Sequence, residues 1–311
     1  MAIAFLFPGQ GAQSVGMAAD LLDRPSIGEL FEQAQRISGL PLTNLCAQGP
    51  EDELARTDIS QPAIFTVSMA LLGELRRAAG ERLPAPAYCA GLSLGEYTAL
   101  CAAGALSFED GLRLVTQRGK LMQAAASQGQ PSGMVSLMGA DEQIAQKVCQ
   151  ACASAGLLVP ANFNCPGQIV LSGAQAACQK AAAIAAECGA SGAVALKVAG
   201  AFHSPFMQPA AEGLAKTLDS VQIRPPAVPV LSNVTGRPHE GCESIKKALL
   251  DQLTHPVRWQ ANCEFLLAQG VSEFLEIGPG RVLAGLMRRI ERRAKVTSVN
   301  SAESLKTFAA T

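Results

Sequence analysis

A pentapeptide of the form GxSxG, residues 91–95 (GLSLG), could place a serine for nucleophilic attack. The sequence predicts a short strand at Tyr88–Ala90 before it and a helix at Glu96–Ala103 after it, which is the setting of a nucleophile elbow. The glycines would allow the sharp, strained turn that exposes the Ser93 side chain. A helix N-terminus there would also aim the backbone N–H of Leu94 at a developing oxyanion. Because 29 glycines make a chance match common, it is this context that favours a nucleophile.

A serine nucleophile needs a base, and the chain has three histidines. His239 lies in a polar turn (TGRPHEG), where we expect a solvated side chain, and His255 precedes a proline in what reads as a structured loop. His203 follows an apolar predicted strand, Ala193–Val198, and a glycine. This places it at the mouth of a sheet, where catalytic side chains lie in open α/β folds. A hydrogen-bonded core histidine is the alternative, and spacing alone favours the base only modestly.

The composition restricts the class of protein. The net charge is −1 and 16% of the residues are charged, which argues against nucleic-acid binding because that needs a basic excess. Aromatic residues make up only 5% of the chain, so the core must be built from alanine, leucine and valine, which fits helices on a parallel sheet. No apolar run approaches the ~18 residues of a membrane span. We therefore expect a cytoplasmic protein without a membrane partner.

Two kinds of cofactor motif are disfavoured. The loop after the first apolar run (PGQGAQSVG) has Ser14 where a dinucleotide fingerprint needs glycine, and it lacks the Gly-Lys-Ser/Thr of a phosphate loop. Cys149 and Cys152 have CxxC spacing, but no second pair and no nearby histidine accompany them. We expect reduced buried thiols and no metal site.

The order of strand and helix patterns predicts a small domain inserted into a larger α/β domain. Residues 128–198 read as strand, helix, two strands, helix and strand, the split order of ferredoxin-like units. Residues 1–127 and 199–311 carry the apolar strands and amphipathic helices of the larger domain, including a helix at Gln61–Ala79 and another at Ser107–Ala126. Strand patterns of the first kind resume after the insert at 228–231, 273–277 and 295–299.

Seven motifs in order carry a resemblance to malonyl-CoA:acyl carrier protein transacylases. They are FPGQGAQ (7–13), GLSLGEY (91–97), QRGKLM (117–122), NFNCPGQIVLSG (162–173), GAFHSP (200–205), QLTHPVRW (252–259) and EIGPGRVL (276–283). The resemblance implies an α/β-hydrolase-like large domain, a ferredoxin-like insert and an active site in the cleft between them. It also implies a discrete acyltransferase of fatty acid synthesis, or of a polyketide assembly line served in trans. The substrate would be malonyl-CoA, the partner an acyl carrier protein, and no cofactor would be needed.

Site residues can be carried over from the resemblance position by position. Ser93 would be acylated, and His203 would be its general base. The histidine would be oriented by the backbone carbonyl of Gln252, so we expect Gln252→Ala to cost little. Gln10 and Leu94 would supply the oxyanion-hole N–H groups.

The resemblance also assigns substrate-binding residues. Arg118 would bind the free carboxylate of the malonyl group, which a planar guanidinium recognises with two hydrogen bonds. Taken alone, Arg118 would be interpreted as a solvated helical arginine like Arg113, and it is the motif set that favours the substrate-binding role. Gln61, Asn162 and Gln168 match polar positions that line the family's cleft.

Leu92 departs from the family pattern, because histidine is more common before the serine in the fatty acid enzymes. This form resembles discrete acyltransferases of polyketide systems. It weakens an assignment to fatty acid synthesis without affecting a catalytic role, since leucine cannot titrate.

Three further alternatives stay open in the sequence. The basic run at 288–293 reads as a helix C-terminus stabilised by cations, or as a docking site for an acidic carrier protein or for CoA phosphates. An acyl hydrolase that clears carrier proteins is a rival function, and retention of Arg118 argues against it. A non-catalytic docking subunit is the second rival, and the complete set of site residues argues against it.

Overall fold

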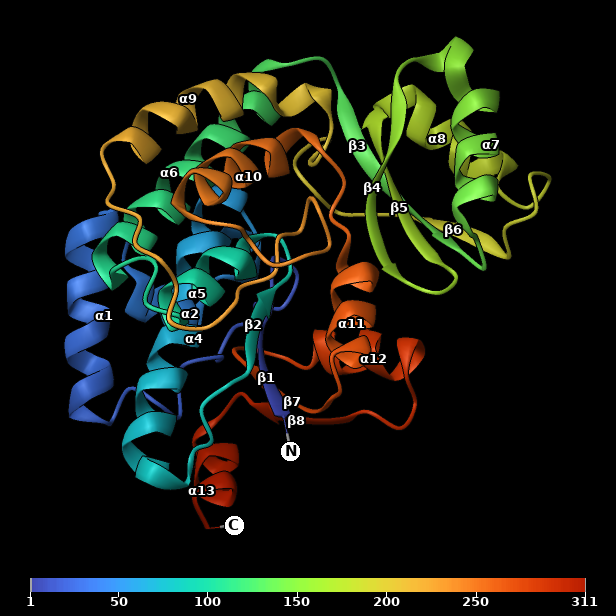
Figure 1. The fold of residues 1–311 in the computed structure, drawn as a ribbon. Coiled ribbons are helices and arrows are strands. Elements are labelled where there is room, and N and C mark those ends of the chain that lie inside the picture. Colours follow the sequence, from blue (N-terminus) through green and yellow to red (C-terminus); the bar gives the residue numbers. More distant parts are fainter. Residues whose placement is uncertain (1, 311) are drawn as a thin grey trace.

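The structure, a computed structural model, describes residues 2–310. Its larger sheet is parallel, with the strand order β2-β1-β7-β8 (Figure 1). The strands are β1 (Ala2–Phe7), β2 (Tyr88–Gly91), β7 (Val271–Ile277) and β8 (Lys295–Val299). β1 is an unbroken apolar run that is almost entirely buried, as expected for a central parallel strand. Its last residue, Phe7, pairs with Gly91 at the end of β2, so the loops that follow these two strands lie side by side.

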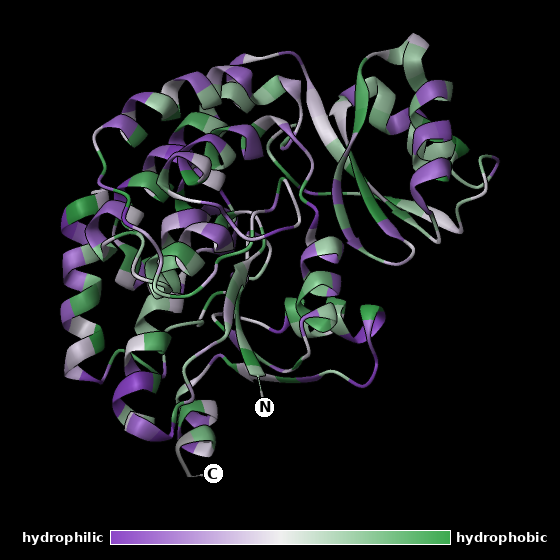
Figure 2. Cartoon of the chain, in the orientation of Figure 1, coloured by the Kyte–Doolittle hydropathy of each residue, from purple (hydrophilic) through white to green (hydrophobic). Residues whose placement is uncertain are grey.

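Helices cover this sheet, and several show both the hydrophobic and the hydrophilic colours expected of amphipathic surface helices (Figure 2). The α-helices are α1 (Pro25–Ser38), α2 (Leu42–Gln48), α3 (Glu51–Leu54), α4 (Thr57–Ala79), α5 (Leu94–Ala102), α6 (Phe108–Gln128), α9 (Gln208–Asp219), α10 (Cys242–Thr254), α11 (Trp259–Ala268), α12 (Val282–Ile290) and α13 (Ala302–Ala310). Ser107 caps α6, because its hydroxyl accepts a hydrogen bond from the Asp110 N–H.

A second, antiparallel sheet has the order β4-β5-β3-β6 and lies beside the parallel sheet and its helices (Figure 1). Its elements are β3 (Ser132–Met138), α7 (Glu142–Cys152), β4 (Leu158–Cys165), β5 (Gln168–Ala174), α8 (Gln175–Ile184) and β6 (Gly192–Ala195). The chain therefore runs βαββαβ, and the predicted combination of a parallel sheet with a separate small sheet is confirmed. Backbone hydrogen bonds of Val257 with Ala161 and Phe163 tie β4 to the segment before α11.

One predicted strand is wrong. Residues 228–231 form only isolated β-bridges. One is a parallel bridge between Val230 and Cys89, and the other is an antiparallel bridge between Leu231 and Pro238. Pro229 has no N–H to donate to a ladder, which explains why the segment does not extend the sheet. No helix within residues 2–310 is long and apolar enough to cross a membrane.

Candidate active site

Ser93 lies at the sharp turn between β2 and α5. Its φ of 51° is in the left-handed region, which non-glycine residues rarely adopt. A Cβ on Gly91 would come within 1.9 Å of the Gly95 backbone, and a Cβ on Gly95 within 2.1 Å of the Phe7 carbonyl oxygen. Both glycines are thus required by close backbone approach. The turn places Ser93 at the N-terminus of α5, where the Leu94 N–H is among the first helical donors that lack an intrahelical acceptor.

His203 lies against Ser93, although 110 residues separate them. Ser93 Oγ is 2.9 Å from His203 Nε2, and His203 Nδ1 is 2.7 Å from the backbone oxygen of Gln252. A carbonyl can only accept, so Nδ1 carries the proton and Nε2 is free to accept from the serine hydroxyl. Both residues are buried, since Ser93 is 8% exposed and His203 is 4% exposed. The arrangement is that of a nucleophile and its base, with a carbonyl in the orienting position.

His203 is held in its neutral form by its surroundings. Burial lowers its pKa to about 4, and the nearby positive charge of Arg118 acts in the same direction. The hydrogen bond to Gln252 opposes this shift without reversing it. The imidazole is therefore unprotonated at neutral pH and able to accept a proton.

Arg118 extends from α6 to the same hydroxyl and is only 1% exposed. Its Nη2 donates to Ser93 Oγ at 3.0 Å and to Gln252 Oε1 at 2.7 Å, and its Nη1 donates to Gln61 Oε1 at 2.7 Å. The guanidinium also lies over the Tyr97 ring, 5.5 Å from its centre. Its Nε is buried without a partner within residues 2–310. Arg118 is thus no solvated helical arginine, because its guanidinium is buried beside the Ser93 hydroxyl.

The Gln252 side chain does more than the sequence indicates. Its Nε2 donates to the backbone oxygen of Ser93 at 3.1 Å and to Glu96 Oε2 at 2.7 Å, while its Oε1 accepts from Arg118. The expectation that Gln252→Ala costs little took only the carbonyl into account. We revise it, because truncation removes three buried hydrogen bonds.

A cavity of about 310 Å³ opens onto Ser93 and His203. Gln10, Asn162 and Gln168 line it, together with apolar side chains from the antiparallel sheet, from α6 and from α12. Neither Gln61 nor Arg118 is among the residues that line this cavity. Gln61 is fully buried and accepts a hydrogen bond from Arg118 Nη1.

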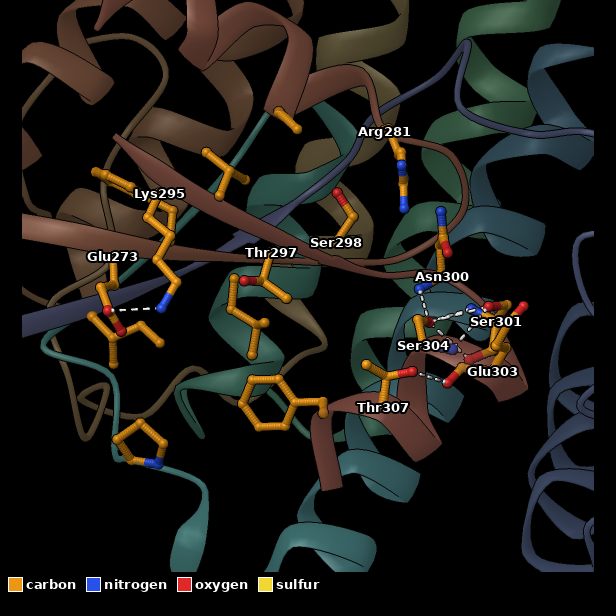
Figure 3. Close-up of a pocket in the computed structure, with 17 residues that line it drawn as sticks. Glu273, Arg281, Lys295, Thr297, Ser298, Asn300, Ser301, Glu303, Ser304 and Thr307 are labelled. Atoms are coloured by element: carbon orange, nitrogen blue, oxygen red, sulfur yellow. Dashed lines mark hydrogen bonds and ion pairs between the residues drawn. The ribbon is translucent and has the colours of Figure 1, made fainter. Parts of the chain in front are cut away.

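A larger cavity of about 850 Å³ lies along β7, β8 and α13 of the parallel-sheet part of the molecule (Figure 3). Its polar side chains pair with one another, as Lys295 does with Glu273 and Ser301 with Ser304. None of the predicted site residues lines it.

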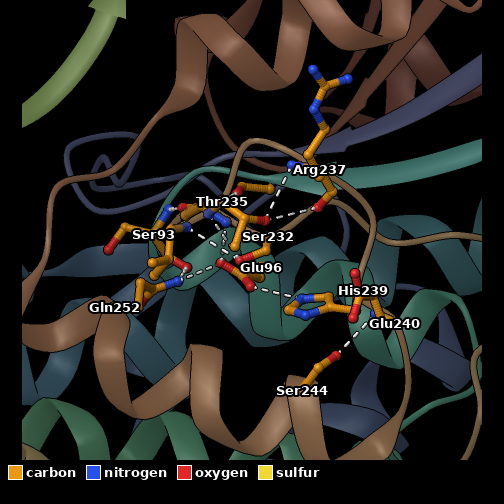
Figure 4. Close-up of polar contacts among 12 residues, drawn as sticks. Ser93, Glu96, Ser232, Thr235, Arg237, His239, Glu240, Ser244 and Gln252 are labelled. Atoms are coloured by element: carbon orange, nitrogen blue, oxygen red, sulfur yellow. Dashed lines mark hydrogen bonds and ion pairs between the residues drawn. The ribbon is translucent and has the colours of Figure 1, made fainter.

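Asn233, Glu96 and His239, which the sequence analysis did not select, support Ser93, and Figure 4 shows the Glu96 carboxylate between Ser93 and His239. Asn233 Oδ1 accepts from the Ser93 N–H, and Asn233 Nδ2 donates to the Gly91 carbonyl at 2.7 Å. The Glu96 carboxylate accepts from the Asn233 N–H at 3.0 Å and from His239 Nε2 at 2.9 Å. The expectation that His239 is solvated is wrong, because 1% of its side chain is exposed. A signal was present in the sequence, since Glu96 is the one charged residue of an apolar helix and a buried carboxylate needs partners.

The remaining candidates of the sequence analysis lie outside this cluster. The ten cysteines are free, and no group of three His, Cys, Asp or Glu within residues 2–310 could hold a metal ion. Burial raises the pKa of the Cys149 thiol to about 12, so it is not a reactive thiolate. Arg288 and Arg289 lie in the last turn of α12, whose Val282 and Leu286 line the cavity at Ser93.

The geometry defines a chemical class. A hydroxyl that donates to a neutral imidazole and accepts from a guanidinium can attack a carbonyl carbon, and a helix N-terminus beside it can hold the resulting oxyanion. This is a serine-dependent acyl-transfer enzyme on an α/β fold.

Comparison with known proteins gives the family. The model of the acyl transferase domain matches residues 4–307, and the chain belongs to this family. It is 42% identical to malonyl CoA-acyl carrier protein transacylase of Bacillus subtilis over 305 residues, which cover 97% of this chain and 95% of that protein. Among solved structures, the transacylase of Coxiella burnetii has a TM-score of 0.94 at 37% identity and covers 100% and 97% of the two chains. A malonyl-transacylase in complex with a type II polyketide synthase acyl carrier protein has a TM-score of 0.93 at 39% identity, with coverage of 100% and 99%.

Proposed function

We propose that the protein transfers the malonyl group of malonyl-CoA to the phosphopantetheine thiol of an acyl carrier protein, in fatty acid or polyketide synthesis. The observation that carries the substrate assignment is the buried guanidinium of Arg118, 3.0 Å from the Ser93 hydroxyl. A cation at that position suits an acyl group with a free carboxylate. The similarity to transacylases that carry this name supports the same substrates.

In the first half of the reaction, Ser93 Oγ attacks the thioester carbonyl carbon while His203 Nε2 takes the hydroxyl proton. The oxyanion of the tetrahedral intermediate is held by the backbone N–H groups of Leu94 and Gln10. As the C–S bond breaks, the imidazolium gives its proton to the departing sulfur, which leaves CoA as a thiol and a malonyl ester on Ser93.

In the second half, the same groups act in reverse order. His203 takes the proton of the phosphopantetheine thiol, and the thiolate attacks the ester carbonyl. The bond to Oγ breaks, and the imidazolium returns the proton to Ser93. Bond formation and cleavage balance, so no metal or redox group enters a step.

The rival function, an acyl hydrolase, differs only in the second acceptor. Water would replace the phosphopantetheine thiol and release malonate. Arg118 supports transfer of a dicarboxylic acyl group, and the largely apolar lining of the cavity limits the access of water to the ester.

Intact-mass measurement after mixing with malonyl-CoA, acetyl-CoA and methylmalonyl-CoA separately tests the proposal. We expect the malonyl adduct to dominate and to map to the peptide that contains Ser93. Addition of a holo acyl carrier protein should discharge the adduct and malonylate the carrier. Ser93→Ala should fold and form no adduct. Loss of the adduct at the same rate with and without the carrier would instead identify a hydrolase.

Two further predictions from the sequence belong to this proposal. We propose residues 128–198 as an insert domain within residues 1–127 and 199–311, which is supported by the confinement of the antiparallel sheet to residues 132–195. Limited proteolysis should cut near those two boundaries. We also propose a cytoplasmic location, which fractionation of the source cells would test.

A further inference from the structure

Glu96 is a fully buried carboxylate that the mechanism above does not use. It lies in the first turn of α5, three residues after Ser93. Its Oε2 accepts from the Asn233 N–H and from Gln252 Nε2, and its Oε1 faces His239 Nε2. Asn233 and His239 belong to the loop before α10 and Gln252 belongs to α10, and Figure 4 shows Gln252 and His239 on either side of the carboxylate.

The Gln252 amide has one possible orientation in this setting. Arginine only donates hydrogen bonds and a carboxylate only accepts them, so the amide oxygen must face Arg118 and the amide nitrogen must face Glu96. Glu96 is therefore one of two acceptors, with the Ser93 carbonyl, that keep the amide nitrogen turned away from the guanidinium. Without the carboxylate, only the Ser93 carbonyl would hold the amide nitrogen, and the amide oxygen would be less firmly fixed against Arg118.

The consequence for the substrate site follows through two contacts. Gln252 Oε1 is one of the two amide oxygens that hold the Arg118 guanidinium against Ser93 Oγ. Glu96 also accepts from Asn233, whose side chain bonds the Ser93 N–H and the Gly91 carbonyl on either side of the strained turn. One buried carboxylate thus supports both the anion-binding cation and the nucleophile, although it touches neither.

We propose that Glu96, held by His239, is a positioning residue that sets the selectivity for malonyl over acetyl groups by orienting Arg118 through the Gln252 amide. This inference rests on the proposed function, since it concerns the substrate preference of the same site. It makes selectivity depend on a residue that lies outside the cavity at Ser93.

Glu96→Gln separates the hydrogen bonds from the charge of the residue, because glutamine has nearly the same size as glutamate. Its amide oxygen can still accept from Gln252 Nε2 and Asn233, and its amide nitrogen can donate to His239 Nε2 if the imidazole carries its proton on Nδ1 instead. Every contact is then retained. Glu96→Ala removes all of them and leaves the Gln252 amide held only by the Ser93 carbonyl and Arg118.

The measurement is the ratio of kcat/KM for malonyl-CoA to that for acetyl-CoA, with melting temperature recorded in parallel. Both substrates are assayed on one preparation, so any misfolded fraction cancels from the ratio. A merely structural role would lower the two values equally. We expect Glu96→Ala to lower the ratio by about tenfold or more, the effect of one hydrogen bond to a charged group. Glu96→Gln should restore the ratio to near that of the unmodified protein.

Glu276 provides the matched control. Its carboxylate is also fully buried and accepts three hydrogen bonds, from the Leu283 and Ala284 N–H groups and from the Ser298 hydroxyl. Glu276→Ala should lower the melting temperature and leave the ratio unchanged.

Two results would overturn the inference. One is an unchanged ratio in Glu96→Ala, and the other is a ratio in Glu96→Gln as low as that in Glu96→Ala. If the unmodified protein itself transfers no malonyl group, the proposed function fails instead, and the two failures are therefore distinguishable.

Discussion

Substitution of Arg118 by alanine tests the link between the buried guanidinium and the choice of acyl group. The structure allows the magnitude to be worked out. Removing one partner of a buried ion pair costs about 3 to 5 kcal/mol when the other charge is left unpaired. Here an acetyl group would not leave Arg118 unpaired, because the side-chain oxygens of Gln61 and Gln252 still accept from it.

The difference between the two acyl groups is therefore smaller than a bare buried charge would give. We take the gain from the malonyl carboxylate as one to two charge-assisted hydrogen bonds, or about 2 to 3 kcal/mol. At about 1.36 kcal/mol per decade, this predicts that Arg118→Ala lowers the malonyl-to-acetyl ratio of kcat/KM roughly 30- to 160-fold. The ratio also cancels any effect on Ser93 itself, since both substrates acylate the same hydroxyl.

The assay compares initial rates for the two thioesters with the unmodified protein, Arg118→Ala, Arg118→Lys and Arg113→Ala. Arg113 lies on the same helix, is exposed and pairs only with Asp110 among residues 2–310, so its substitution should leave the ratio unchanged. Lysine keeps the charge and loses the planar fork, and we expect an intermediate ratio. An unchanged ratio in Arg118→Ala would refute the reasoning and remove the structural basis for the malonyl assignment.

Three further outcomes are expected. His203→Ala should lower the rate of acylation by about 10² to 10⁴, measured as appearance of the adduct by rapid-quench mass spectrometry, and a loss below tenfold would contradict its role as base. Gln252→Ala keeps the orienting carbonyl but removes the side-chain contacts to Arg118 and to the Ser93 carbonyl. The value of kcat/KM should therefore fall further for malonyl-CoA than for acetyl-CoA, and equal losses for the two substrates would contradict this. The acidic limb of the pH profile of kcat/KM should lie near the His203 pKa of about 4, because the base must be neutral to act. In Arg118→Ala the limb should move to higher pH, since a positive charge that disfavours the imidazolium is gone, and a downward shift would contradict the sign.

The sequence predicts the local geometry around Ser93, because that geometry depends on short patterns in the chain. The strand, turn and helix around Ser93 each have their own signal, and the order of elements from 128 to 198 predicts the split sheet. The contact between Ser93 and His203 depends on the fold, so spacing alone distinguishes poorly among three histidines. The motif set supplied what spacing did not.

The sequence analysis did not identify the residues that support Ser93, namely Glu96, Asn233 and His239, for a physical reason. His239 lies in a segment rich in glycine, proline and polar residues, which predicts a solvated turn. Whether such a turn faces water or a buried carboxylate depends on a partner 143 residues away. Glu96 was the one indication of a buried partner, because an ionised group in an apolar helix is costly unless a residue elsewhere in the chain binds it. Asn233 gave no comparable signal.

Ser93 and His203 are the two non-glycine residues with positive φ within residues 2–310, at 51° and 56°. Each such conformation costs on the order of 1 to 3 kcal/mol, against a net folding stability of about 5 to 15 kcal/mol for a typical domain. Ser93 and His203 are therefore two of the most strained positions of the backbone. Selection for thermal stability alone would favour glycine at both positions and would yield a more robust fold without catalysis. Variants that gain stability and keep activity must draw it from elsewhere in the molecule, such as its surface helices.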